Sequence, residues 1–354
     1  MTRSFAVCAS LLALGTLLAG CRPDAELVGP SAGRVAADAA TDDGPRWSDW
    51  SPPSNLGPLI NATGFDQSGP ALSKDGLSLY FASDRTGGFG RNDLWVAQRA
   101  SRDDAWGAPR DLGPAVNSVG DDFAPNFSND GHWMYYSSDR PGGCGAQDLY
   151  VSYRQHTQDD FDWQPTVNLG CVVNTPFNDW LPDPFEDLAT GVTILYFSSN
   201  RPGGIGFLNT YASTQAEDGS FGSAALVPEL SSAARDARPV VSRNGLELYL
   251  ASNRAGGLGD WDLWVSRRTS TLDPWGTPVD VGASVNTQYF EAAPGLSADG
   301  TMLFLRSTRP GGFAVGDLYV STRRHGSGPD VAVGAGPEIQ KKEKSHRKDK
   351  AHKK

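Results

Sequence analysis

The chain has 354 residues and a formal net charge of −10. Its 41 Gly, 24 Pro and 10 Trp are typical of a protein built from many short strands and tight turns. No segment keeps a helical period over twelve residues. Beyond the N-terminal apolar run, no stretch is long and apolar enough to cross a bilayer, which excludes a polytopic helical membrane protein.

The N-terminus has the layout of a secretory signal peptide over residues 1–20. Arg3 precedes the apolar run Phe5 to Leu18, which is too short for a stable membrane span. The run ends in Leu-Ala-Gly-Cys21, which resembles the bacterial lipobox. The resemblance implies cleavage before Cys21, lipidation of Cys21 and export to the cell envelope. Arg22 after the cysteine favours the outer membrane. The alternative is an ordinary signal peptide with a chance cysteine.

Both ends of the processed chain are predicted to lie outside the folded domain. Residues 21–46 are rich in Ala, Asp, Gly and Pro without hydrophobic periodicity, so we expect a flexible tether. Residues 326–354 are predicted to be a disordered tail, whose last part, Lys341 to Lys354, has eight Lys or Arg against Glu343 and Asp349. The tail is either simply solvated or attracted to an anionic envelope surface. Nucleic acid is not an expected partner of an exported protein.

One repeat dominates the middle of the chain and occurs five times. Its signature is Ser-Asp-Arg or Ser-Asn-Arg, then Gly-Gly, then Asp-Leu-Trp or Asp-Leu-Tyr. The spacing of the repeat arginines is 53 to 61 residues, and they are Arg85, Arg140, Arg201, Arg254 and Arg309. A period of this length indicates a solenoid or a propeller.

Each copy predicts four strands, and five four-stranded sheets around an axis form a β-propeller over residues 47–325. The first strand follows a proline and ends in a turn that is Asp-Gly or Asn-Gly in four copies. The fifth copy lacks its last strand, whereas Trp50 to Asn61 matches Trp106 to Asn117 position by position. The N-terminal segment is therefore predicted to supply the outer strand of the last blade. A six-bladed ring is the alternative, with room only in the longer third copy.

The repeat resembles the WD40-like (PD40) propeller repeat of the TolB type. The matching residues are Pro-x-x-Ser-x-Asp-Gly, Ser-Asp-Arg-x-Gly-Gly-x-Gly and Asp-Leu-Trp/Tyr, over about residues 47–325. The resemblance implies a periplasmic or envelope propeller that binds a partner. It does not identify that partner.

An acidic residue near the first-strand proline of every copy suggests a ring at one mouth of the central channel. The five residues are Asp66, Asp122, Asp179, Asp236 and Glu291. The ring could bind a cation or a basic partner segment. Alternatively, each carboxylate pairs with a repeat arginine and joins neighbouring blades, which the matching counts favour.

Two further sets of residues have a structural and a chemical interpretation. Asp93, Asp148, Asp262 and Asp317, with Asn209 in the third copy, are expected to cap Gly-rich loops. Calcium is the alternative there, but each loop offers few oxygen ligands, so no cofactor or metal is expected. Cys144 and Cys171 follow the second and fourth strands of blade two, so they can form a disulfide, the alternative being two free thiols.

No catalytic motif stands out among the Ser, His and acidic residues. We therefore expect a monomeric, non-catalytic lipoprotein that binds an envelope protein or polymer, and not an enzyme. The alternative is a carbohydrate-active hydrolase or lyase centred on the channel. A cluster of non-repeat polar residues in the channel would favour that alternative.

Overall fold

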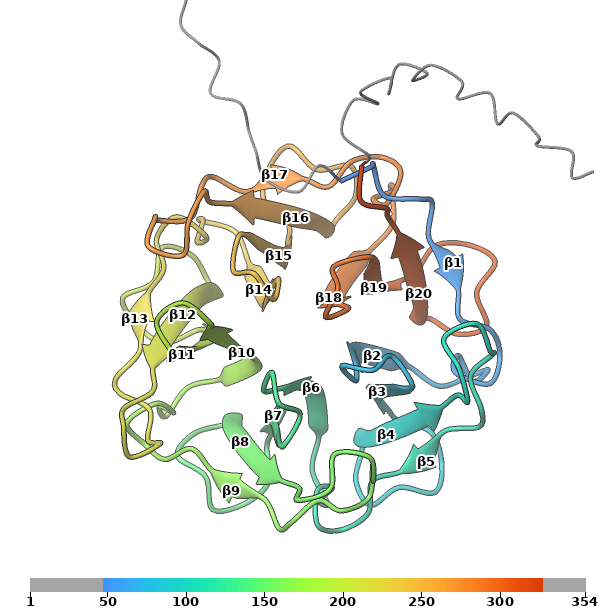
Figure 1. Cartoon of the computed structure of the whole chain (residues 1–354), viewed down its shortest axis with the longest axis horizontal. Coiled ribbons are helices and arrows are strands. Elements are labelled where there is room, and N and C mark those ends of the chain that lie inside the picture. Colours follow the sequence, from blue (N-terminus) through green and yellow to red (C-terminus); the bar gives the residue numbers. More distant parts are fainter. Residues whose placement is uncertain (1–46, 327–354) are drawn as a thin grey trace, which may run out of the picture. The chain divides into compact units, whose positions relative to one another are not determined.

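The computed structural model describes residues 47–326, which form one five-bladed β-propeller (Figure 1). Cys21, the predicted signal peptide and tether, and the Lys-rich tail lie outside the described residues. Blade one contains β2 (Gln67–Leu72), β3 (Ser78–Ser83), β4 (Asp93–Gln98) and β5 (Arg110–Asp111). Blade two contains β6 (Asp122–Phe127), β7 (Trp133–Ser138), β8 (Asp148–Tyr153) and β9 (Val167–Asn168).

The other three blades follow the same order. Blade three contains β10 (Asp179–Asp187), β11 (Val192–Ser199), β12 (Asn209–Thr214) and β13 (Ala225–Leu226). Blade four contains β14 (Asp236–Val241), β15 (Glu247–Ser252), β16 (Asp262–Arg267) and β17 (Val279–Asp280). Blade five contains β18 (Glu291–Leu296), β19 (Met302–Ser307), β20 (Asp317–Thr322) and β1 (Ser54–Asn55). All pairings within the blades are antiparallel.

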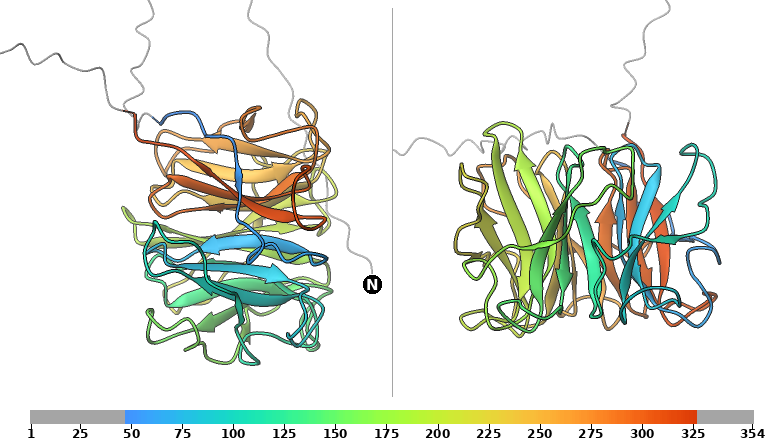
Figure 2. Two further views of the ribbon diagram at one scale, coloured as in Figure 1. Left: turned by 90° about the vertical axis from the view of Figure 1, so that its right-hand side faces the viewer. Right: turned by 90° about the horizontal axis from the view of Figure 1, so that it is seen from below.

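The first strand of every blade lies nearest the central axis and the short fourth strand lies at the rim (Figure 1). The inner strands run along the axis, as the side view shows (Figure 2).

The ring closes with β1, as the sequence predicted. Ser54 pairs with Val320 and Asn55 with Tyr319. Asn61, which is fully buried, then joins the same strand: its Nδ2 donates to the Leu318 carbonyl at 2.9 Å and its Oδ1 accepts from the Leu318 N–H at 2.8 Å. Asn117, Asn174 and Asn286 make the same pair of bonds with Leu94, Leu149 and Leu263.

The hydrophobic core is divided among the five interfaces between blades. At the interface of blades one and two, for example, Tyr80 and Leu94 pack against Met134 and Tyr136. The interface of blades five and one packs Phe304 and Leu318 against Phe81. Because each sheet buries both of its faces in this way, the ring has no separate core layer.

The extra length of the third copy does not form a sixth blade. It lengthens the hairpin of β10 and β11, which pair from Asp179–Ser199 to Asp187–Val192. The described part of the chain thus contains five blades, which settles the choice between five and six. Residues 47–326 contain no helix that could span a membrane.

Candidate functional site

Four of the five predicted acidic residues are buried ion-pair partners inside their own blades. The carboxylates of Asp122, Asp179, Asp236 and Glu291 have no exposed surface and lie 2.5–3.2 Å from the guanidinium groups of Arg140, Arg201, Arg254 and Arg309. Each arginine also donates to a carbonyl in the segment that leads into its blade, such as Val116 for Arg140. The pairs thus fasten each inner strand to that segment, and these carboxylates do not form an open ring.

Blade one departs from this arrangement, and Asp66 is not equivalent to the other four acids. Gln67 pairs with Ser83 just as Asp122 pairs with Ser138, so the glutamine occupies the acidic position. Arg85 consequently has no carboxylate partner there and donates to the carbonyl of Ile60. Burial lowers the pKa of Arg85 to about 10. The predicted set of five equivalent acidic residues was therefore wrong in blade one. In the other four blades the acidic residue stands three positions before the first-strand proline, and in blade one that position is Gln67.

Asp66 instead lies at the mouth of the channel beside blade five. Its carboxylate accepts hydrogen bonds from Nε and Nη2 of Arg306 at 2.9–3.1 Å, and 43% of its side chain is exposed. Sequence repeats could not reveal this contact, because Arg306 is not a repeat arginine.

The loop aspartates cap backbone N–H groups. Asp93 accepts from the N–H groups of Phe89 and Gly90, and Asp262 accepts from those of Leu258 and Gly259. Asp148 and Asp317 have the same role, and Asn209 replaces them in blade three. Within residues 47–326 no group of three His, Cys, Asp or Glu side chains has the arrangement of a metal site.

Cys144 and Cys171 form a disulfide in blade two, with a Cα–Cα distance of 5.5 Å. Cys144 follows β7 and Cys171 follows β9, so the bond joins two connections on one side of the blade. It lies away from the channel and takes no part in the pocket described next.

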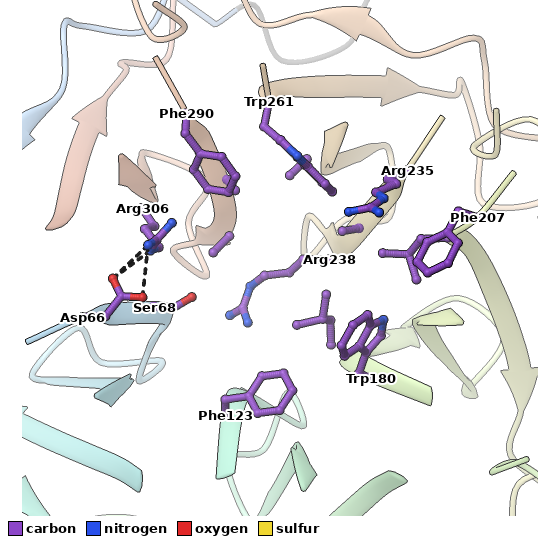
Figure 3. A pocket seen from close by; sticks show the side chains of 16 residues that line it. Asp66, Ser68, Phe123, Trp180, Phe207, Arg235, Arg238, Trp261, Phe290 and Arg306 are labelled. Atoms are coloured by element: carbon purple, nitrogen blue, oxygen red, sulfur yellow. Dashed lines mark hydrogen bonds and ion pairs between the residues drawn. The ribbon is translucent and has the colours of Figure 1, made fainter. Parts of the chain in front are cut away.

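The mouth of the channel on the Asp66 side holds a pocket of about 420 Å³ (Figure 3). Its floor comes from a bulge that interrupts the pairing of the first and second strands in every blade, for example between Ser68 and Ala71. The bulge contains a residue with positive φ directly before the first-strand proline. These five residues are Gly69, Ala124, Leu181, Arg238 and Ala293, with φ between 51° and 62°.

Four of these five residues are not glycine, and a left-handed residue with a side chain costs about 1–2 kcal/mol. The bulge turns this residue and its predecessor toward the pocket, because Leu181, Arg238 and Ala293 line it. The preceding residues are small in three blades (Ser68, Ala237 and Ala292) and large in two (Phe123 and Trp180). The pocket is therefore asymmetric, with an aromatic wall over blades two and three.

The rim of the pocket adds aromatic and charged side chains from other blades (Figure 3). The Arg235 guanidinium lies 4.7 Å from the centre of the Phe207 ring. The Arg306 guanidinium lies 5.1 Å from the centre of the Phe290 ring, and that ring is 5.9 Å from Trp261. Five aromatic side chains, three arginines and one carboxylate thus surround the pocket, and Asp66 is that carboxylate. None of the three arginines is a repeat arginine.

Arg238 lies near the centre of the pocket in Figure 3. It is buried, and burial lowers its pKa to about 10. Asp183 lies beyond the bulge, where it accepts from the Val241 N–H and from Nδ2 of Asn126, both at 2.8 Å. Burial raises the pKa of Asp183 to about 7, although the charge of Arg238 acts in the opposite direction.

Comparison with solved structures identifies similar propellers with low sequence identity. An α-L-arabinofuranosidase from Lactobacillus brevis is 14% identical, with 75% of this chain and 92% of that chain covered and a TM-score of 0.52. An α-L-arabinofuranosidase from Podospora anserina, solved in complex with cellotriose, is 12% identical, with 79% and 96% covered and a TM-score of 0.50. TolB from Acinetobacter baumannii reaches a TM-score of only 0.40, with 55% of that chain covered.

These findings correct the family expected from the repeat. The matches with TM-scores of 0.50 or more that are described above are arabinofuranosidases, which contradicts the TolB-type assignment and the non-catalytic, protein-binding scaffold that followed from it. No family model matches the sequence, and no curated protein matches it. At these identities the likeness shows the shared propeller fold alone.

Proposed function

We propose that this propeller is a carbohydrate-active hydrolase whose substrate binds in the pocket at the Asp66 mouth of the channel. The observation that carries the proposal is the combination of an aromatic wall with a partly exposed carboxylate in a pocket of about 420 Å³. The similar arabinofuranosidases add support at the level of fold.

The aromatic wall suits a sugar because its rings offer apolar faces beside polar groups. Phe123 and Trp180 meet edge to face with their ring centres 6.4 Å apart, and the pocket extends from them to Phe207 and Trp261. The C–H face of a sugar ring packs against such aromatic faces, while its hydroxyl groups bond with polar neighbours. Ser68 and the rim arginines are the polar neighbours here.

Asp66 is the residue with which we associate the chemistry. Arg306 fixes its carboxylate through two nitrogen atoms, and the exposed part of the side chain faces the pocket. Glycoside hydrolases usually employ two carboxyl groups, whereas this pocket has one. Asp66 would therefore act as the general base that activates water, with the leaving oxygen protonated from solvent. Slow turnover is expected.

The test is cleavage of a panel of arabinan, xylan and acidic polysaccharides, measured as newly formed reducing ends. Asp66→Asn should abolish cleavage while Asp103→Asn, at an exposed position away from the pocket, should not. Trp180→Ala should raise KM more than it lowers kcat, because the ring contributes binding. Full activity of a folded Asp66→Asn protein, or the absence of any saccharide binding or cleavage, would refute the proposal.

We also propose that the chain acts in the cell envelope, attached through a lipid on Cys21 and monomeric. This rests on the lipobox-like sequence before that cysteine. Mass spectrometry of the N-terminal peptide from the native host would test it. An unmodified Cys21, or an uncleaved residue 20–21 bond, would contradict the proposal.

A further inference from the structure

Arg238 is the exception among the five left-handed residues of the pocket floor. The equivalent residues are Gly69, Ala124, Leu181 and Ala293, which are apolar. The repeat therefore does not require a cation at this position. Blade four nevertheless places a long charged side chain there, in a backbone conformation that costs about 1–2 kcal/mol for any residue with a Cβ.

The guanidinium of Arg238 has only part of its hydrogen-bonding capacity satisfied. Its Nε donates to the Pro294 carbonyl at 2.8 Å and its Nη2 donates to the Pro70 carbonyl at 3.1 Å. Nη1 is buried and has no hydrogen-bond partner. A buried donor left without an acceptor costs about 1–3 kcal/mol, so an acceptor bound at this point would be favoured.

The charge balance of the pocket also favours a negatively charged acceptor. Three arginines line the pocket against one carboxylate, and that carboxylate is already bonded to Arg306. Asp183 is on the other side of the bulge and forms no ion pair with Arg238 among the described residues. The chain as a whole carries a net charge of −10, so the pocket is a local excess of positive charge on an acidic protein.

Arg235 extends the positive charge from the floor to the rim. It is exposed, stacks on Phe207, and forms no salt bridge within the described residues. Arg238 and Arg235 come from the same stretch of blade four, three residues apart, and both line the pocket. Trp180, from the neighbouring blade three, lies beside Arg238 in Figure 3, and Phe123 lies next to Trp180.

We propose that the pocket selects an anionic saccharide, with the carboxylate or sulfate of one sugar residue on Arg238 and that sugar's ring on Trp180. Arg235 would then contact the acidic group of the next residue along the chain. This inference rests on the proposed function and adds the substrate class to it. Carboxylated and sulfated sugars share the recognised chemistry, and the experiment separates them.

The experiment is calorimetric binding of three oligosaccharides of equal length: oligogalacturonate, a sulfated galactan fragment and a neutral xylo-oligosaccharide. We expect an acidic ligand to bind at least about tenfold more tightly than the neutral one, the size of one charge-assisted hydrogen bond. Its affinity should fall as salt is raised, and that of the neutral ligand should not. A preference for galacturonate over the sulfated ligand assigns a carboxylate, and the reverse assigns a sulfate.

Arg238→Met should lower the affinity for the acidic ligand about tenfold more than the affinity for the neutral ligand. Arg243→Met is the matched control, because Arg243 lies beyond the bulge at a separate cavity with Asp183. If Arg238→Met does not fold, Arg235→Gln should still reduce the preference, since Arg235 is exposed.

The outcomes distinguish the two proposals. Equal affinity for acidic and neutral ligands, or a preference unaffected by both arginine substitutions, overturns this inference while the proposed function stands. Failure of all three ligands to bind overturns this inference, and failure of the whole polysaccharide panel to bind or to be cleaved overturns the proposed function as well.

Discussion

Gly69 and Arg238 are in contact across the channel, and the absence of a side chain at Gly69 leaves room for the Arg238 guanidinium. A Cβ added to Gly69 would lie 3.0 Å from Nη1 of Arg238 and 3.0 Å from Cα of Ala124. Blade one therefore has its glycine where the long side chain of blade four needs space. The two residues come from different repeats, so the fit is a property of the closed ring.

Gly69→Ala should destabilise the protein by about 2–4 kcal/mol and weaken ligand binding at the pocket. The methyl group adds left-handed strain of about 1–2 kcal/mol and displaces the Arg238 guanidinium. Gly113→Ala is the control, because Gly113 has φ of +83° but nothing within 4 Å of its added Cβ. Chemical denaturation measures both variants. Equal losses would show that contact with Arg238 contributes nothing.

Gln67→Glu should stabilise the protein, because it restores to blade one the ion pair that the other blades have. Arg85 is partly buried without a carboxylate, and Oε1 of Gln67 is buried without a partner. Glu291 shows that a glutamate fits this position in blade five, 3.2 Å from Arg309. We expect a gain of about 1 kcal/mol, measured as a higher Tm.

The reverse substitution in blade five is Glu291→Gln. It should lower Tm, because Arg309 would lose its carboxylate partner and resemble Arg85 in blade one. If Gln67→Glu is less stable than the unmodified protein, desolvation of the new carboxylate outweighs its attraction to Arg85.

Asn61→Ala should cost about 1–3 kcal/mol, because it leaves the buried N–H of Leu318 without a partner, whereas the Leu318 carbonyl keeps its bond from the Leu56 N–H. Asn117→Ala removes the equivalent bonds to Leu94 within a blade made of continuous chain. Hydrogen exchange should show faster exchange along β1 and β20 for Asn61→Ala alone. Similar exchange in both variants would mean that the closure is no weaker than the other blades.

The raised pKa of Asp183 predicts that the folded protein loses part of its stability as pH rises from about 4 to about 7. Its folded-state pKa is about 7, above the value of about 4 for an unfolded aspartate. In that window the folded state binds more protons than the unfolded state, so increasing pH favours unfolding by up to about 1.4 kcal/mol per pH unit. Asp183→Asn should show a flatter dependence of Tm on pH over this range. Identical slopes would refute the assignment.

The repeat allowed the fold to be predicted, including the number of blades and the closure by β1. Five copies of the same turn and strand signals fix each blade independently, and the match of Trp50 to Asn61 with Trp106 to Asn117 reveals the offset. Blades one to four each lie within one continuous segment of the chain, so local sequence holds the information for them.

The pocket could not be predicted in the same way, because its residues are the ones that differ between copies. Phe123 and Trp180 occupy a bulge position that holds Ser or Ala in the other blades, and Arg238 occupies one that holds Gly, Ala or Leu. A search for the repeat pattern treats such differences as divergence between the copies. The sequence did single out Asp66, but it was grouped with the wrong residues of the other repeats. Its structural equivalents are Asp121, Asn178, Arg235 and Phe290. Numbering each repeat from its first-strand proline would have separated these residues from Asp122 and its equivalents.

The closure of blade five has a consequence for how the chain reaches its native state. β1 is synthesised first and its partner β20 last, so the earliest strand must wait unpaired until the final one emerges. Pairing of such distant segments is slow, and an incomplete chain exposes β20 or its neighbour as an open sheet edge. Blades one to four each form from one continuous segment of the chain, whereas the completed ring, and with it the Asp66–Arg306 contact, requires blade five to fold against blade one.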